Sequence, residues 1–188
     1  MQALTIDFIC SLDGYASATG WPGWWGLESP EYLQWLDEQP DKDAPLLMGA
    51  RTYRVMSALT AEGEPGTDVL DGIRKHVFSA TLQEPLAWVN STLVRTDAVE
   101  YVRALKEESD RPLRTIGSIA LSRSLLMAGL VDRYRLVIFP VITGATGHER
   151  IFDGYPDVAM DLVESRTFDR RTQLLEYVPT VLDGPPGA

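Results

Sequence analysis

Three short segments place glycine or hydroxyl residues where a strand-like run passes into a helix-like run. They are residues 48–53 (Met-Gly-Ala-Arg-Thr-Tyr), 79–81 (Ser-Ala-Thr) and 116–120 (Ile-Gly-Ser-Ile-Ala). A helix that begins directly after a strand presents free backbone N–H groups and the positive end of its dipole, which together bind anions such as phosphate. We therefore predict that the three segments line one cleft beyond the carboxyl ends of the strands. The structural alternatives are an ordinary helix start, a plain turn and a tight glycine turn.

Two carboxylates are candidate catalytic residues. Asp13 follows the first predicted strand in the run Ser-Leu-Asp-Gly, and Glu31 lies in the first turn of a predicted helix. A carboxyl group at the mouth of a cleft can orient or protonate a substrate. The alternative for Asp13 is a turn in which its side chain closes the strand. The alternative for Glu31 is a favourable interaction with the helix dipole.

Tryptophan is concentrated in one segment, at positions 21, 24, 25 and 35. We predict that Trp24, Trp25 and Trp35 form a stacking wall that binds the flat ring of a substrate. The alternative is that these large side chains cover the core, since aromatic residues bury much apolar area. Cys10 is the single cysteine and is expected to be a core thiol, because it cannot form a disulfide within the chain.

The elements that must position these residues alternate between strands and helices. Strands are predicted at 3–10, 46–49, 74–79, 89–95, 113–116 and 134–142, and helices at 30–38, from 51, at 98–108 and at 119–128. Residues 159–168 and 172–181 alternate like an antiparallel hairpin. This order predicts an α/β fold with a mixed, mainly parallel central sheet and helices on both faces. A single domain over residues 1–182 and a flexible tail at 183–188 are expected.

Composition narrows the function classes. The 188 residues carry a formal net charge of −10, which argues against a protein that binds nucleic acids or a membrane surface. Two histidines and one cysteine do not suggest a metal site. No run is long enough to span a membrane, and the N-terminus lacks the basic region of a secretion signal. A cytoplasmic, metal-free protein is therefore expected.

These elements, in this order, resemble the dihydrofolate reductase-like superfamily. The matching stretches are SLDGY at 11–15, LLMGARTY at 46–53, VFSAT at 77–81 and TIGSIALSRSLLMAGLVDRYRLVIFPVITG at 115–144, followed by Ile151 and Phe152. The closest likeness is to the reductase domain of riboflavin-biosynthesis deaminase/reductases and their stand-alone relatives. The C-terminal hairpin fits the last strands of that family.

The resemblance implies reduction of a C=N or C=O bond in a small heterocyclic or carbonyl substrate, such as a riboflavin precursor or a pterin, with NADPH (NADH possible) as cofactor. It implies a homodimer by analogy. Carried over by position, the resemblance implies that Cys10 and Ser11 lie at the nicotinamide carboxamide, and that a phosphate-binding helix start is formed by Gly49, Ala50, Arg51 and Thr52. The adenosine ribose and the 2′-phosphate would lie beside Ser79, Ala80 and Thr81. The pyrophosphate and the nicotinamide side would contact Ile116, Gly117, Ser118, Ile119 and Ala120.

Two positions depart from the pattern that the resemblance implies. The family usually has Gly-Gly where this chain has Gly117–Ser118, and that pair is joined by a cis peptide in dihydrofolate reductases. Many relatives have an arginine for the 2′-phosphate where this chain has Ala80, a loss for which Arg51 could compensate. The alternative function is therefore a binding protein of the same fold that lacks hydride-transfer activity.

Overall fold

The sheet is the element that organises this molecule. The computed structural model describes residues 3–20, 24–64, 67–108 and 110–187, of which residue 24 is described for its backbone alone. Ten strands were found in that part of the chain: β1 (Leu4–Ser11), β2 (Tyr15–Ala18), β3 (Leu46–Gly49), β4 (Lys75–Phe78), β5 (Ser91–Val94), β6 (Leu113–Thr115), β7 (Arg133–Phe139), β8 (Gly147–Arg150), β9 (Val158–Phe168) and β10 (Thr172–Val181). Eight of them form one sheet in the order β5-β4-β3-β6-β1-β7-β10-β9. Strands β2 and β8 pair separately.

The central sheet is parallel from β5 to β7 and ends in an antiparallel hairpin. Parallel pairing joins β5 to β4, β4 to β3, β3 to β6, β6 to β1 and β1 to β7. Strand β10 is antiparallel to both β7 and β9. The predicted fold class is therefore confirmed. Parallel strands end at one common edge of a sheet, so the segments that follow β3, β4, β6 and β1 meet there.

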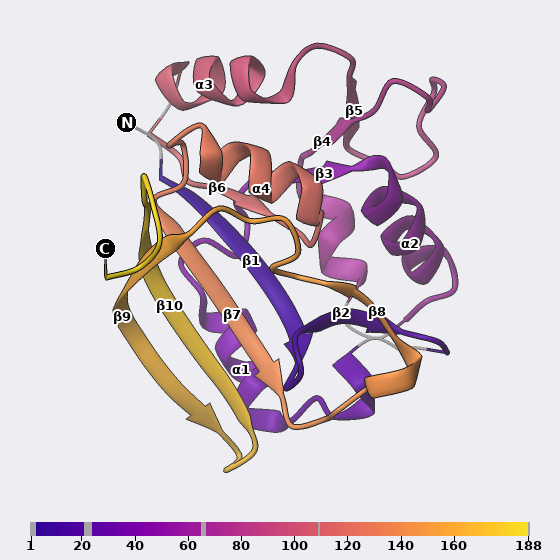
Figure 1. The fold of residues 1–188 in the computed structure, drawn as a ribbon. Coiled ribbons are helices and arrows are strands. Elements are labelled where there is room, and N and C mark those ends of the chain that lie inside the picture. Colours follow the sequence, from indigo (N-terminus) through magenta and orange to yellow (C-terminus); the bar gives the residue numbers. More distant parts are fainter. Residues whose placement is uncertain (1–2, 21–23, 65–66, 109, 188) are drawn as a thin grey trace.

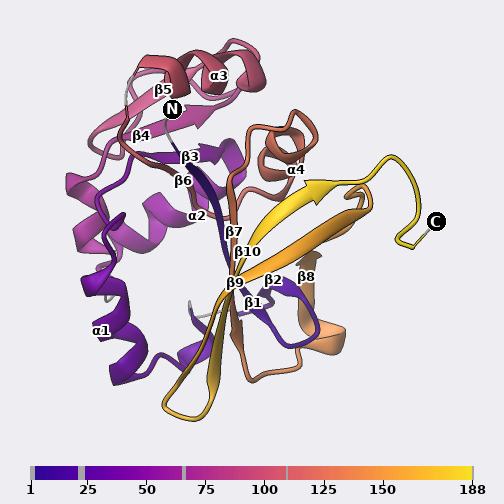
Figure 2. The same ribbon diagram turned by 90° about the vertical axis from the view of Figure 1, so that its left-hand side faces the viewer.

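Four helices cover the two faces of the sheet: α1 (Pro30–Glu38), α2 (Ala50–Ala61), α3 (Ala98–Glu108) and α4 (Ile119–Met127). Helix α1 packs on Val137 and Phe139 through Tyr32 and Trp35, and α2 packs on Met48 through Tyr53. Helices α3 and α4 share a cluster with Leu4 and Leu47 on the other face. Figure 1 shows α4 in front of the sheet, and Figure 2 shows α1 and α4 on its opposite sides.

Alternation along the strands explains why both faces of the sheet are apolar. In β1, Ile6, Phe8 and Cys10 are buried toward α4, while Ile9 packs toward α1. A parallel sheet covered on both faces requires such nearly continuous apolar runs. No helix in the described ranges is both long enough and apolar enough to cross a membrane.

Besides shifts of one or two residues at the ends of elements, the structure differs from the sequence prediction in two places. Strand β7 ends at Phe139 rather than at residue 142, because Pro140 has no N–H group to donate to a ladder. Residues 15–18 and 147–150 lie outside the predicted strands but form β2 and β8. Three short 3₁₀ turns complete the described elements, η1 (Trp24–Gly26), η2 (Asp68–Gly72) and η3 (Gly144–Thr146).

Candidate active site

The first and third predicted segments meet through the Ser118 side chain. The Gly49 backbone N–H donates to Ser118 Oγ at 2.9 Å, and Ser118 Oγ lies 2.9 Å from Thr52 Oγ1. Gly117 and Ser118 both have left-handed backbone conformations, with φ of 52° and 64°. A Cβ on Gly117 would lie 3.5 Å from Thr52 Oγ1, an ordinary van der Waals contact, so glycine is favoured there by its left-handed φ and not by lack of space. The hydroxyl of Ser118 therefore joins the beginning of α2 to the beginning of α4.

The N-termini of these two helices are open to a ligand. Gly49 is the N-cap of α2 and Ser118 is the N-cap of α4, and neither helix has a side-chain capping hydrogen bond. The N–H groups of a helix's first turn have no partner within the helix. Two such turns, held together at Ser118, place a pair of positive dipole ends at one edge of the sheet. The arrangement can bind an extended anion such as a diphosphate.

The second predicted segment lies beside the first one. Gly49 is paired with Phe78 in the register of β3 and β4, so Ser79 follows at the same edge of the sheet. The Ser79 hydroxyl accepts hydrogen bonds from the Thr81 and Leu82 N–H groups, at 3.1 and 3.0 Å. Its oxygen is thus engaged in closing a turn, which favours the plain-turn alternative for this hydroxyl. Ala80 and Thr81 remain exposed.

Arg95 was missed by the sequence analysis. It follows β5, whose last residue, Val94, pairs with Phe78 at the end of β4. Its guanidinium donates to the carbonyl oxygens of Leu82 and Ala80 at 2.8 and 3.3 Å. This places a cation beside the position where the resemblance had led us to expect an arginine. The available signal was an arginine at the end of a predicted strand, at the same edge as the other segments.

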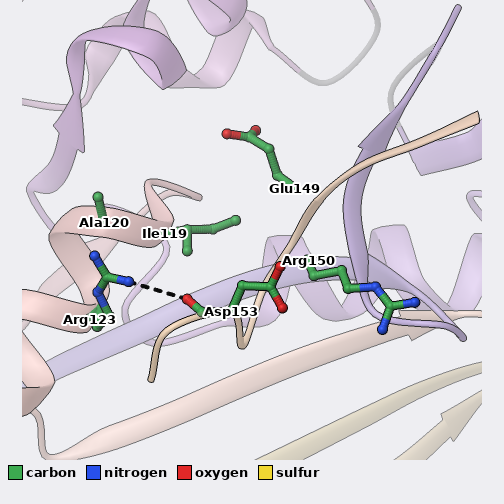
Figure 3. A pocket seen from close by; sticks show the side chains of 6 residues that line it. All are labelled: Ile119, Ala120, Arg123, Glu149, Arg150 and Asp153. Atoms are coloured by element: carbon green, nitrogen blue, oxygen red, sulfur yellow. Dashed lines mark hydrogen bonds between the residues drawn. The ribbon is translucent and has the colours of Figure 1, made fainter. Parts of the chain in front are cut away.

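A pocket lies between the start of α4 and strand β8. Its volume is about 250 Å³, and it is lined by Ile119, Ala120, Arg123, Glu149, Arg150 and Asp153. Figure 3 shows the Glu149 and Arg150 side chains pointing away from each other, and Arg123 bonded to the Asp153 backbone. Of the predicted residues, Ile119 and Ala120 line this pocket. Glu149 also forms an ion pair with Arg51, at 2.6 Å between Oε1 and Nη1.

Asp13 is placed where its side chain joins two loops. Its carboxylate accepts hydrogen bonds from the Ser11 hydroxyl at 2.6 Å and from the Thr143 and Gly144 N–H groups at 3.2 and 2.9 Å. The Ser11 hydroxyl, followed by these backbone donors, lowers the pKa of Asp13 to about 2. A carboxyl group with so low a pKa stays ionised at neutral pH and is a poor proton donor. The geometry favours the turn-closing alternative.

Glu31 is engaged with the C-terminal hairpin. Its carboxylate accepts a hydrogen bond from the Asp169 N–H at 2.7 Å, and the Asp169 carboxylate accepts one from the Glu31 N–H at 3.0 Å. This reciprocal pair fastens the start of α1 to the turn between β9 and β10. The contacts therefore favour the structural alternative for Glu31.

The tryptophans and Cys10 are placed in different surroundings. Trp35 is 4% exposed and packs between Tyr32 and Phe168, so a substrate ring cannot reach it without displacing the core. Trp25 is partly buried against Phe139. The side chain of Trp24 lies outside the described part of the structure, as does Trp21. Burial raises the pKa of the Cys10 thiol to about 12, which makes it an inert core group.

A larger hollow lies at the other edge of the sheet. Its volume is about 760 Å³, and its lining includes His76 and Ser91, near the beginnings of β4 and β5. Ser91 pairs with Lys75 rather than with His76, so the two side chains lie on opposite faces of the sheet. In the described residues, no cluster of three or more His, Cys, Asp or Glu side chains could hold a metal ion. The helix N-termini therefore remain the best-built candidate site.

Comparison with known proteins gives relatives that span nearly the whole chain. The uncharacterized protein YyaP of Bacillus subtilis strain 168 is 24% identical over 182 residues, which cover 94% of each chain. A solved structure of a protein named for riboflavin biosynthesis, from Shewanella sp. PV-4, has a TM-score of 0.72 at 17% identity and covers 95% of this chain and 99% of its own.

A second solved structure, a pyrimidine reductase-like protein of Corynebacterium diphtheriae, has a TM-score of 0.64 at 16% identity and covers 95% of this chain and 92% of its own. The deaminase/reductase of Thermotoga maritima has a TM-score of 0.66 at 17% identity, and 57% of its length is covered. These likenesses agree with the fold described above. The family model of the RibD C-terminal domain matches residues 2–174, and the chain therefore belongs to the RibD C-terminal domain family.

Proposed function

We propose that this protein is an NADPH-dependent reductase of a small heterocyclic substrate, of the riboflavin-precursor or pterin-like class. The observation that carries the proposal is the junction at Ser118, where the uncapped N-termini of α2 and α4 lie side by side. Membership in the RibD C-terminal domain family supports a reductase-like activity. A nicotinamide cofactor supplies a hydride, and the protein must bind and orient both reactants.

The residues present fit a dinucleotide. Gly49 has an ordinary extended φ of −85°, and the nearest atom to a Cβ built on it is Ser118 Oγ at 4.0 Å. Neither backbone strain nor crowding therefore requires glycine there, and the space it leaves open suits a phosphate group. The N–H groups at the starts of α2 and α4 would hold the pyrophosphate. Ala80 and Thr81, together with the Arg95 guanidinium, would lie at a 2′-phosphate.

The experiment that tests this site places a carboxylate at Gly49. Aspartate is a favourable N-cap residue, so Gly49→Asp should keep or raise the stability of α2. Its carboxylate would occupy the N-terminus of α2 and repel a phosphate. We expect at least about a tenfold loss of NADPH affinity, which corresponds to about 1.4 kcal/mol. The matched control is Gly49→Asn, which also caps a helix but carries no charge.

Affinity is measured by titration with NADPH and NADH, using energy transfer from tryptophan to the nicotinamide. Tighter binding of NADPH than of NADH by the unmodified protein would support the 2′-phosphate position beside Arg95. Unchanged NADPH affinity in Gly49→Asp would contradict the proposed site. Binding without oxidation of NADPH, over a screen of pterins, flavin precursors and aldehydes, would instead support the binding-protein alternative.

A further inference from the structure

We propose that Glu149 lowers the affinity of this protein for its cofactor by competing with a cofactor phosphate for the Arg51 guanidinium. The inference rests on the proposed function, because it concerns the same phosphate site. It adds a residue that neither the sequence motifs nor the family likeness singled out. Glu149 lies on β8, about a hundred residues beyond the segment of α2 that it contacts.

The position of the Glu149 carboxylate carries the argument. Its Oε1 lies 2.6 Å from Arg51 Nη1, and Arg51 is the second residue of α2. Glu149 also lines the pocket that begins at Ile119 and Ala120, the first two residues of α4. A single carboxylate thus contacts the cation at one helix start and borders the other helix start. Both helix dipoles attract negative charge to this place, which is where an anionic ligand would bind.

The backbone holds Glu149 in this position. Its φ is 62°, a left-handed conformation that residues other than glycine rarely adopt. The neighbouring residues on either side are paired with β2, His148 with Ser17 and Arg150 with Tyr15. Strand pairing on both sides fixes the direction in which the Glu149 side chain leaves the strand. Figure 3 shows that it extends on the opposite side from the Arg150 guanidinium.

Competition follows from charge and from the shared partner. The carboxylate engages Nη1 of the guanidinium, so a phosphate must displace it from that nitrogen or use the remaining donors alone. The carboxylate, left behind at the same helix starts, then repels the phosphate. Both side chains are solvent-exposed, Arg51 at 72% and Glu149 at 37%, so the pair is weak enough to exchange. The pair therefore modulates affinity without closing the site.

The test compares Glu149→Gln with Glu107→Gln, which removes the same charge from an exposed position near the end of α3. Dissociation constants for NADPH and NADH are measured by titration at low and at high salt. We expect Glu149→Gln to tighten NADPH binding about two- to fivefold at low salt, the range of an exposed ion pair. The gain should shrink at high salt, because screening weakens exposed charges. Glu107→Gln should leave both constants unchanged.

Comparing NADPH with NADH distinguishes the two phosphate groups that Arg51 could bind. A larger gain for NADPH than for NADH would place Arg51 at the 2′-phosphate, and equal gains would place it at the pyrophosphate; both support the competition. In an Arg51→Ala background, Glu149→Gln should bring a smaller gain, because only the direct repulsion between the carboxylate and the phosphate is then relieved. A gain as large as in the presence of Arg51 would overturn the competition.

The failure of this inference is distinguishable from that of the proposed function. If the unmodified protein binds NADPH and Glu149→Gln binds it equally well, the competition is overturned and the reductase proposal stands. If the unmodified protein, Glu149→Gln and Glu107→Gln all fail to bind either dinucleotide, both proposals are overturned. Binding that is detected only in Glu149→Gln would support the competition in its strongest form.

Discussion

Asp13 shows how one side chain can determine the shape of the candidate site without taking part in chemistry. Its two oxygens accept hydrogen bonds from groups on both loops that leave the carboxyl ends of β1 and β7. Removing it would free the segment from Val141 to Gly144, because among the described residues the other backbone hydrogen bond between that segment and the first loop runs from the Leu12 N–H to the Val141 carbonyl. A residue predicted to be catalytic therefore has the contacts of a positioning residue.

We predict that Asp13→Asn lowers the free energy of unfolding by about 2 kcal/mol at pH 7, because an amide NH₂ would face a backbone N–H and charge-assisted hydrogen bonds would be lost. Asp161→Asn, at an exposed position of β9, is the control and should have little effect. Urea unfolding measures both variants. Full stability of Asp13→Asn with a loss of turnover would return Asp13 to a catalytic role.

The same contacts predict a pH dependence. The pKa of Asp13 is lowered in the folded protein to about 2, against about 3.9 in an unfolded chain. A group whose folded pKa is lowered stabilises the fold above its unfolded pKa, and this contribution is lost as the pH falls through the folded pKa. The stability difference between the unmodified protein and Asp13→Asn should therefore be constant above about pH 5 and shrink between about pH 4 and pH 2.

Single residues were predictable from the sequence where their partners are near in the chain. The Ser11–Asp13 contact spans two residues, and a turn-closing role was among the alternatives for Asp13. The contacts of Arg95 with residues 80–82 and of Glu149 with Arg51 were not predictable, because nothing local indicates which loops meet. Trp35 shows the converse difficulty, since a tryptophan in the core and one on a stacking wall have the same local sequence.

At the scale of elements, the junction of α2 and α4 depends on a serine at a position where the family resemblance led us to expect glycine. The Ser118 hydroxyl accepts a hydrogen bond from the Gly49 N–H and contacts Thr52. The Ser118 backbone nevertheless has a φ of 64°, which is unfavourable for a residue with a side chain. The Gly117–Ser118 peptide is trans, since Glu84–Pro85 is the single cis bond among the described residues. A polar contact between two turns thus offsets a local backbone cost.

We predict that Ser118→Ala lowers the free energy of unfolding by about 1–3 kcal/mol, because it leaves the part-buried Gly49 N–H without an acceptor. Ser118→Gly should be less damaging, since glycine relieves the left-handed strain of about 1–2 kcal/mol. Ser124→Ala, at an exposed position of α4, is the control and should have little effect. Equal losses in Ser118→Ala and Ser118→Gly would show that strain plays no part.

The elements that the sequence predicted are those with strong apolar periodicity. Strands β2 and β8 were not among them, because each has four residues and their pairing joins positions about 130 residues apart. The close packing of β2 and β8 is known from the three-dimensional structure and could not be deduced from the local sequence. A Cβ on Gly147 would lie 2.6 Å from both Thr143 Oγ1 and Tyr15 Cγ, so glycine is required at that position.

At the scale of the whole molecule, the order of strands was not deducible from periodicity. Strand β1 lies between β6 and β7, which are more than a hundred residues away in sequence. The alternation of strands and helices indicated a parallel sheet, while the assignment to a known fold depended on the ordered set of motifs. The two edges of the sheet also differ: β5 has four residues, and β9 has eleven.

The long edge strand is the surface on which we propose that a second copy of the chain binds. An edge strand presents unpaired N–H and C=O groups, and such edges associate unless they are protected. On β9, Leu162 and Val163 are 58% and 51% exposed, which adds apolar surface to the free edge. The same strand on a second copy can pair with it about a two-fold axis. This is the homodimer that the family resemblance led us to expect.

We predict that the unmodified protein has about twice the chain mass of 20.9 kDa in size-exclusion chromatography with light scattering. Leu162→Lys should shift it toward the monomer, because a lysine on an edge strand opposes strand pairing and removes apolar contact. The matched control is Val69→Lys, since Val69 is 65% exposed on η2, far along the chain from β9. A dimer that persists in Leu162→Lys but dissociates in Val69→Lys would place the interface elsewhere, and a monomeric unmodified protein would contradict the dimer itself. The hairpin that carries the interface also contacts the start of α1 through Asp169 and Glu31. A change of NADPH affinity with protein concentration would therefore indicate that dimerisation affects the sheet edge that carries the site.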